Sequence, residues 1–139
     1  RDKKRPSVKE ASNLIALILY KNIRQPSMIQ FIAGLMVGGI NKDGSCELYS
    51  VEPAGSTMRV EDFDANFSSG MPYILGLLEN RYRKDISIKE AIELAADSIK
   101  SATERDTASG YGIDVYAITK DGIKQVFKQK GEWKYIDEK

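Results

Sequence analysis

The tetrapeptide Asn-Lys-Asp-Gly at residues 41–44 separates two apolar runs and strongly constrains the fold. Its last residue, Gly44, can take the positive φ that a tight hairpin turn needs. The preceding run, residues 28–40, is nearly continuous in apolar residues, which is typical of a strand buried on both faces. The following run, from Cys46 to Val51, predicts the return strand. Because so short a turn can join only antiparallel strands, the chain must contain an antiparallel sheet.

Two more segments of the sequence predict strands. Residues 53–56 interrupt the second strand, and residues 57–67 favour another, with Met58 and Val60 on alternate positions and Ala65 farther along the same run. Near the other end, residues 113–119 and 123–127 predict a second hairpin around a turn at residues 120–122. The tail, residues 128–139, is polar, although Trp133, Tyr135 and Ile136 could pack locally.

Two Ser-x-x-Glu sequences predict the starts of long helices. Ser7 with Glu10, and Ser87 with Glu90, form capping boxes in which hydroxyl and carboxylate satisfy each other's backbone amides. The first helix should stop near Arg24, because Pro26 disfavours helix at the residue before it. The helical spacing of apolar residues predicts these core faces: Val8, Ala11, Leu14, Ile15, Ile18 and Leu19 in the first helix, and Ile88, Ala91, Ile92, Ala95 and Ile99 in the other.

A further helix lies between them. Ser68 or Ser69 is the expected N-cap, and Pro72 falls in the first turn, where its missing N–H costs nothing. The helix should run to about Arg83, and it presents the apolar residues Ile74, Leu75, Leu77 and Leu78. The order of elements is therefore helix, strand hairpin, strand, two helices and strand hairpin. An amphipathic helix pair must cover a sheet face, so we expect an α+β layered sandwich forming a single domain over residues 1–139.

Composition excludes several function classes. With 21 Lys and Arg against 20 Asp and Glu, the charge balance gives no indication of a nucleic-acid partner, and no apolar run is long enough to predict a membrane span. The single Cys46 excludes an internal disulfide, fits a reducing compartment, and is expected to be a small buried apolar group. Because the sequence has no histidine, Ser–His or Cys–His nucleophile pairs and a His-ligated zinc site are excluded.

The best local candidate for a functional site is the acid and hydroxyl pair Asp106 and Ser109, three residues apart. Taken alone, the pair indicates a helix end held by side-chain caps, and Ser69 alone indicates an N-cap, so neither pattern by itself points to a catalytic site. Three glycines, at positions 34, 38 and 39, lack the spacing and the following Gly-Lys-Ser/Thr of a phosphate loop, and they indicate close backbone contacts instead.

Five segments in order resemble one known family. They are Val-Gly-Gly-Ile at residues 37–40, Glu-Pro-Ala-Gly at 52–55, Ser-Gly-Met-Pro at 69–72, Leu-Gly-Leu-Leu-Glu at 75–79 and Arg-Asp-Thr-Ala-Ser-Gly at 105–110. Together they resemble the archaeal-like proteasome β-subunit family of threonine proteases, over a stretch from the Ser7 helix to about Ile118. Against that family's pattern, Ser68 replaces glycine, Met71 replaces serine and Glu52 replaces aspartate.

The resemblance implies the four-layer αββα sandwich of antiparallel sheets of the N-terminal nucleophile hydrolases, here as its larger C-terminal part. It also implies a threonine endopeptidase without cofactor or metal, in which an N-terminal threonine hydroxyl attacks the peptide carbonyl and its α-amino group acts as base. Asp106 would orient and support the ammonium, Ser109 would complete the hydrogen-bond network, and Ser69 would help place the amine or a water. The implied partners are other β subunits in a seven-membered ring, proteasome α subunits and unfolded polypeptide substrates, in the cytoplasm, with no nucleic acid or membrane.

The threonine nucleophile, its activating lysine and the oxyanion glycine have no counterpart among these residues. Since the chain opens on Arg1 and a basic run to Arg5, which we expect to be solvated, we expect a processed chain or a part of a longer one. These 139 residues alone should therefore give no turnover. Two alternatives remain: a non-catalytic ring scaffold of the same family, distinguishable by the upstream coding sequence, and an unrelated α+β interaction module, which would be a monomer or dimer.

Overall fold

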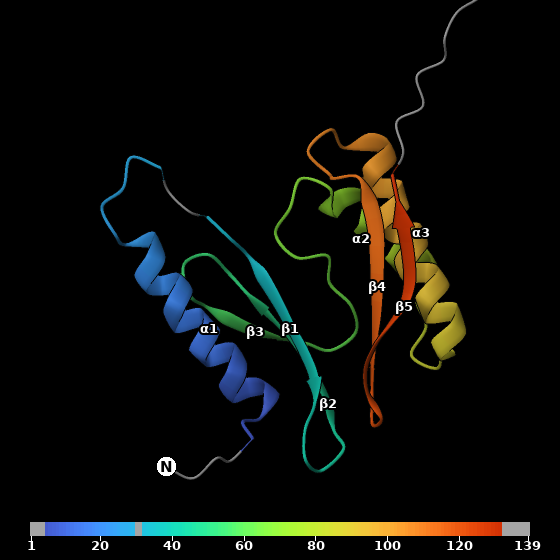
Figure 1. Ribbon diagram of the computed structural model, residues 1–139, viewed down its shortest axis with the longest axis horizontal. Coiled ribbons are helices and arrows are strands. Elements are labelled where there is room, and N and C mark those ends of the chain that lie inside the picture. The colour runs from blue at the N-terminus through green and yellow to red at the C-terminus, as the bar shows by residue number, and fades with distance from the viewer. Residues whose placement is uncertain (1–4, 30–31, 132–139) are drawn as a thin grey trace, which may run out of the picture. The chain divides into compact units, whose positions relative to one another are not determined.

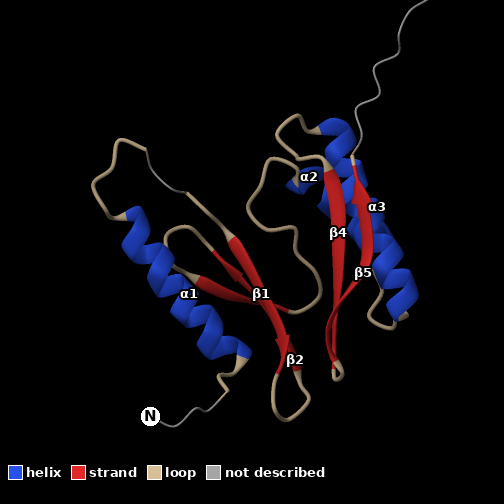
Figure 2. Ribbon diagram, viewed as in Figure 1, coloured by secondary structure: helices blue, strands red, loops and turns tan. Residues whose placement is uncertain are grey.

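The computed structural model describes residues 5–29 and 32–131 of the chain. Its elements are helices and the strands of antiparallel sheets, in the order α1, β1, β2, β3, α2, α3, β4, β5, so the α+β class is confirmed (Figures 1 and 2). The contacts divide the chain into two compact units: the first runs to Ser68 and takes in Ile118–Gly122, and the second comprises Ser69–Ala117 and the residues from Ile123 onward. The single domain expected over residues 1–139 stays a prediction.

The first unit is a helix packed on a three-stranded sheet. Helix α1 (Val8–Ile23) packs against β1 (Leu35–Ile40), β2 (Cys46–Val51) and β3 (Thr57–Val60), in the sheet order β1-β2-β3 with both pairings antiparallel. The predicted hairpin turn is confirmed, because Gly44 has φ +86° and the Asn41 amide donates to the Ser45 carbonyl. Val51 is fully buried in this unit.

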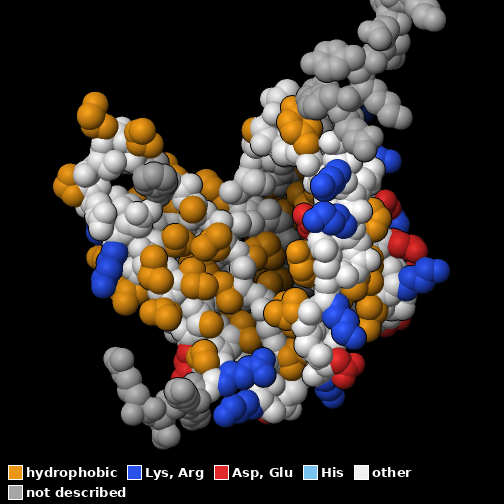
Figure 3. Space-filling model, in the orientation of Figure 1, with side chains coloured by type: hydrophobic (Ala, Val, Ile, Leu, Met, Phe, Trp, Pro, Cys, Tyr) orange, Lys and Arg blue, Asp and Glu red, His pale blue; other side chains and the backbone are white. Residues whose placement is uncertain are grey.

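The predicted core face of α1 is partly wrong. The first capping box is present, but the buried residues are Val8, Ser12 and Ala16, whereas Leu14 and Ile18 are exposed. This helix has apolar residues on more than one face, so spacing alone could not select the face that meets the sheet. Apolar side chains accordingly lie on the surface of the first unit (Figure 3).

Three predictions about the strands of the first unit are corrected. The strand predicted over residues 28–40 begins only at Leu35, where its pairing with β2 begins, and it is not buried on both faces, since its residues are half-buried or exposed. The strand predicted over residues 57–67 ends at Val60, where its pairing with β2 ends. Cys46, expected to be buried, is exposed, since it begins β2 directly after the turn.

Close contacts of the glycines are confirmed in this unit. A Cβ on Gly39 would lie 2.9 Å from Val8 Cγ2, and one on Gly38 would lie 3.3 Å from Leu48 Cδ1. A Cβ on Gly34 would lie 2.9 Å from Asn66 Oδ1. These positions therefore serve packing, as the sequence indicated.

The second unit is a helix pair with a strand hairpin. Helix α2 (Met71–Arg81) packs against α3 (Ile88–Arg105), and the two-stranded sheet of β4 (Gly112–Thr119) and β5 (Gly122–Lys130) follows. A groove of about 240 Å³ is lined by Ile92 and Ala96 of α3 together with Ile113 and Phe127 of the hairpin, so the sheet lies alongside α3. Residues 128–130, predicted as tail, extend β5, and Trp133, Tyr135 and Ile136 lie outside the described residues.

Two predictions for the helix pair are corrected. The buried face of α3 is Leu94, Ser98 and Ala102, whereas Ile88 and Ile99, which were expected in the core, are exposed. Helix α2 starts at Met71 with Gly70 as its N-cap residue, and among the described residues no side chain caps it, so neither Ser68 nor Ser69 is an N-cap. Pro72 does lie in the first turn, and the second capping box, Ser87 with Glu90, is present.

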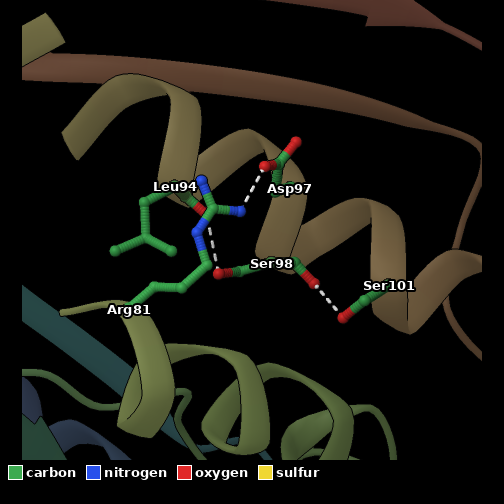
Figure 4. Close-up of polar contacts among 5 residues, drawn as sticks. All are labelled: Arg81, Leu94, Asp97, Ser98 and Ser101. Carbon is green, nitrogen blue, oxygen red and sulfur yellow. Dashed lines mark hydrogen bonds and ion pairs between the residues drawn. The ribbon is translucent and has the colours of Figure 1, made fainter. Parts of the chain in front are cut away.

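Polar contacts link α2 and α3 at the surface of the helix pair. Arg81 Nη1 lies 2.6 Å from Asp97 Oδ2, and the Ser101 hydroxyl donates to the Ser98 carbonyl (Figure 4). The Ser101 hydroxyl also lies within hydrogen-bond distance of the Tyr73 carbonyl on α2, at 3.3 Å. The buried Ser98 hydroxyl donates to the Leu94 carbonyl over 2.7 Å, so it is satisfied inside α3. Small side chains with internally satisfied hydroxyls let the two helices approach closely.

Candidate functional site

The candidate site lies where the end of α3 meets the start of α2, within the second unit. Asp106 is the C-cap residue of α3, with an extended backbone (φ −108°, ψ 115°), and its amide donates to the Ala102 carbonyl over 2.8 Å. The Ser109 amide returns to the Asp106 carbonyl over 3.1 Å and closes a turn. This turn places the Asp106 carboxyl and the Ser109 hydroxyl on the same side of the chain.

The structure brings all three predicted site residues together on a single oxygen. The Ser109 hydroxyl donates to Asp106 Oδ2 over 2.6 Å, and the Ser69 hydroxyl donates to the same oxygen over 2.8 Å. The second carboxyl oxygen, Oδ1, accepts from the Ala108 amide over 3.3 Å. The carboxyl group is thus oriented by three donors from two segments of the chain. We call Ser69, Asp106 and Ser109 the acid–hydroxyl cluster.

Hydrogen bonding lowers the pKa of Asp106 below its ordinary value of 3.8. The Ser109 hydroxyl is the largest cause and the Ser69 hydroxyl the next, while partial burial opposes them and backbone amides add to them. Each donor binds the charged carboxylate better than the neutral acid, so ionisation becomes easier. At neutral pH, Asp106 is therefore a fixed, oriented negative charge that could hold a cation such as an ammonium group.

Gly70 also belongs to this site, and sequence reasoning gave it no role. It is buried, and a Cβ built on it would lie 2.9 Å from the Ser109 hydroxyl oxygen and 3.5 Å from Asp106 Oδ2. Its position between Ser69 and the first turn of α2 was the only local signal, and glycine is common at helix starts for other reasons.

Other chemistry is sparse in the described residues. Within residues 5–29 and 32–131, no group of three or more His, Cys, Asp or Glu side chains is placed to hold a metal ion. No helix in the same ranges is both long and apolar enough to cross a bilayer. Among the described residues, the acid–hydroxyl cluster is thus the clearest candidate for a catalytic or binding site.

The comparisons with known proteins agree on one family. The family model described as "Proteasome subunit" matches residues 1–118. "Proteasome subunit beta 1" of Hyperthermus butylicus is 41% identical over 123 residues, covering 87% of this chain and 57% of the relative. "Proteasome subunit beta" of Methanosarcina mazei is 38% identical over 120 residues, covering 86% of this chain and 54% of the relative.

A shorter match is closer in sequence. "Proteasome subunit beta" of Haloquadratum walsbyi is 47% identical over 94 residues, covering 68% of this chain and 37% of the relative. The chain thus spans about half the length of the curated relatives it matches over most of its own length. Since the family model covers most of the chain and these relatives are archaeal β subunits, the chain belongs to the proteasome subunit family.

Proposed function

We propose that the acid–hydroxyl cluster supports a threonine nucleophile in a proteasome-type endopeptidase. The observation that carries the proposal is the single carboxyl oxygen of Asp106, which accepts hydrogen bonds from both the Ser109 and the Ser69 hydroxyls. Family membership supplies the protease context, in which an amine would act as the base.

The role of each residue follows from its hydrogen bonds. Asp106, ionised at neutral pH, would stabilise the ammonium form of the nucleophile's α-amino group after it takes the hydroxyl proton. Ser109, which gives Asp106 its shorter hydrogen bond, would fix the carboxylate and complete the network around the amine. Ser69 would hold the carboxylate from the segment that precedes α2 and help place the amine or the water that hydrolyses the acyl intermediate. None of the three is the nucleophile.

The partners we propose follow from the same family. The full-length protein would form a seven-membered ring with other β subunits, stack on rings of α subunits, and degrade unfolded polypeptides inside the resulting barrel, in the cytoplasm. Ring closure would use heterologous contacts, in which two different patches of each subunit meet. Native mass measurement of the full-length protein tests this: a ring or a stacked barrel is expected, whereas a monomer or dimer would contradict the assembly.

The decisive test is Asp106→Asn in the full-length, assembled protein. This variant keeps the size of the side chain and removes its charge, so we expect a strong fall in kcat on fluorogenic peptides with assembly intact. Asp85→Asn, an exposed change outside the cluster, is the matched control and should turn over peptides as the wild type does. Wild-type rates in assembled Asp106→Asn would remove Asp106 from the reaction. An assembled wild-type protein that hydrolyses no peptide would instead indicate a ring scaffold.

A further inference from the structure

Gly70 occupies a backbone conformation that any residue could adopt. It is the N-cap residue of α2, and its φ of −77° and ψ of −10° lie in the right-handed helical region. Glycine is usually required where φ is positive, and that reason does not apply here. Any constraint on the side chain at this position therefore comes from the space around it, not from its backbone conformation.

The space beside Gly70 is filled by the site itself. A Cβ on Gly70 would lie 2.9 Å from Ser109 Oγ, 3.1 Å from Ala102 Cβ and 3.5 Å from Asp106 Oδ2. Real Cβ atoms essentially never approach another heavy atom to less than 3.0 Å, so something would have to move. Ala102 is buried in α3 and its Cβ is fixed by the helix backbone, so it can yield little. The Ser109 hydroxyl is the part that can rotate away.

We propose that Gly70 is a positioning residue for the acid–hydroxyl cluster. Its lack of a Cβ lets the start of α2 lie against the end of α3 while Ser109 keeps the rotamer that reaches Asp106. Gly70→Ala would push the Ser109 hydroxyl off Asp106 Oδ2. The link to catalysis rests on the proposed function above, whereas the link to the hydrogen bond does not.

Gly76 provides a matched control in the same helix. It lies inside α2, and apart from its chain neighbours and the nearby backbone of its own helix, no described atom lies within 4 Å of the place where its Cβ would be. Glycine inside a helix is less stable than alanine because it loses more conformational freedom on folding, so Gly76→Ala should raise the melting temperature slightly. Each variant adds one methyl group, at the N-cap of α2 for Gly70→Ala and inside α2 for Gly76→Ala, and only the change at position 70 should reach the cluster.

The experiment uses the full-length, assembled protein with Gly70→Ala, Gly76→Ala, Ser109→Ala and the double variant Gly70→Ala/Ser109→Ala. The pKa of Asp106 is followed by NMR titration of its labelled carboxyl carbon, and kcat and KM are measured on a fluorogenic peptide. We expect Gly70→Ala to raise the pKa of Asp106 towards its ordinary value and Gly76→Ala to leave it unchanged. The double variant should titrate as Ser109→Ala does, because the hydroxyl that the new methyl group would displace is already gone.

The activity readout separates this proposal from the proposed function. We expect Gly70→Ala to lower kcat at least roughly tenfold with little change in KM, since misplacing a catalytic group by about 1 Å can cost a hundredfold. A raised pKa with unchanged kcat would support positioning by Gly70 and contradict a catalytic role for Asp106. The positioning role would be overturned if Asp106 kept its wild-type pKa in Gly70→Ala. It would also be overturned if the pKa shift of Asp106 in the double variant equalled the sum of the shifts in the two single variants. If Gly70→Ala does not fold, recovery of folded protein in the double variant supports the proposal, and failure in both backgrounds overturns it.

Discussion

Ser69 and Asp106 lie 37 positions apart in the sequence, and the hydroxyl of the first donates to the carboxyl of the second over 2.8 Å. Ser109 donates to the same oxygen from only three positions away. A single carboxylate therefore joins a local turn at the end of α3 to the segment that precedes α2. The charge state of Asp106 consequently reports on both connections, and the two can be separated by mutation.

Removing the Ser109 hydroxyl should affect Asp106 more than removing the Ser69 hydroxyl. Ser109 is the largest cause of the lowered pKa and makes the shorter hydrogen bond. We expect Ser109→Ala to raise the pKa of Asp106 more than Ser69→Ala does, measured by carboxyl NMR titration of the full-length protein. Ser101→Ala is the control, because that hydroxyl donates to carbonyls of α2 and α3 and not to Asp106. A larger shift in Ser69→Ala would contradict the predicted order.

The lowered pKa of Asp106 also predicts how stability depends on pH. The folded pKa lies below the ordinary 3.8, so the unfolded chain binds the proton more readily in acid. The contribution to stability is therefore complete above the ordinary pKa and is lost as the pH falls through the lowered folded value. Melting temperatures of the full-length wild type and Asp106→Asn should differ by a constant amount near neutral pH and converge in acid.

Asp85→Asn controls for the change in net charge in this pH series. A difference between wild type and Asp106→Asn that grows in acid would contradict the sign of the pKa shift.

The helix start at Ser87 is a separate test of local stability. The Ser87 hydroxyl accepts from the Glu90 amide and donates to the Glu90 carboxylate, which lowers the pKa of that carboxyl. Ser87→Ala should lower the free energy of unfolding by about 1 kcal/mol and raise the pKa of Glu90 towards its ordinary value. Urea unfolding and NMR titration of the full-length protein measure the two effects. Ser87→Thr keeps a hydroxyl and should lose less, and equal losses in both variants would exclude the cap as the cause.

The features that sequence predicted correctly are those decided by neighbours in the chain. Both capping boxes and the Gly44 turn involve residues at most four positions apart, so the interacting groups are visible in the sequence. Strand ends were misplaced because a strand stops where its partner stops. The apolar run beginning at Met28 could not show that pairing starts at Leu35. The buried faces of α1 and α3 were mispredicted for the same reason, since burial depends on which face of a helix meets its packing partner in the fold.

The candidate site likewise has a part that neighbours in the chain decide and a part that only the fold brings together. Asp106 and Ser109 could be paired from sequence because one turn joins them. Ser69 had no local signal beyond a helix cap, a role that the structure does not give it, and only the family resemblance placed it with Asp106. The crowding at Gly70 depends on atoms of α3, so it could be found only in the folded chain.

The Arg81–Asp97 ion pair should contribute little to stability despite its short distance. The two atoms lie 2.6 Å apart, but the side chains are 48% and 51% exposed, so water and salt screen the attraction. A double-mutant cycle with Arg81→Ala and Asp97→Ala in the full-length protein should give a coupling of about 0.2–1 kcal/mol that weakens at high salt. The Arg83–Glu90 pair, with atoms 4.0 Å apart, is the comparison and should couple less. A coupling that does not change with salt would contradict the exposed geometry.

Gly55 and Gly44 offer a matched pair for separating backbone strain from steric clash. Each ends a four-residue turn, with its amide donating to the carbonyl three residues earlier, and their φ values are +89° and +86°. A Cβ on Gly44 would meet only Lys120 Cε, at 3.9 Å, whereas one on Gly55 would lie 2.6 Å from Tyr20 Cβ and 2.8 Å from the Ala16 carbonyl oxygen. Both substitutions strain the turn, but only Gly55→Ala also pushes against the backbone of α1.

We therefore expect Gly44→Ala to lower the free energy of unfolding by about 1–2 kcal/mol, the cost of a left-handed conformation for a residue with a side chain. Gly55→Ala should lose a further 1–3 kcal/mol, roughly, because α1 must shift from its contact with the sheet. Urea and thermal unfolding of the full-length protein measure both changes. Equal losses in the two variants would mean that α1 moves aside at no cost, and its packing on the sheet would then be looser than the buried Ala16 indicates.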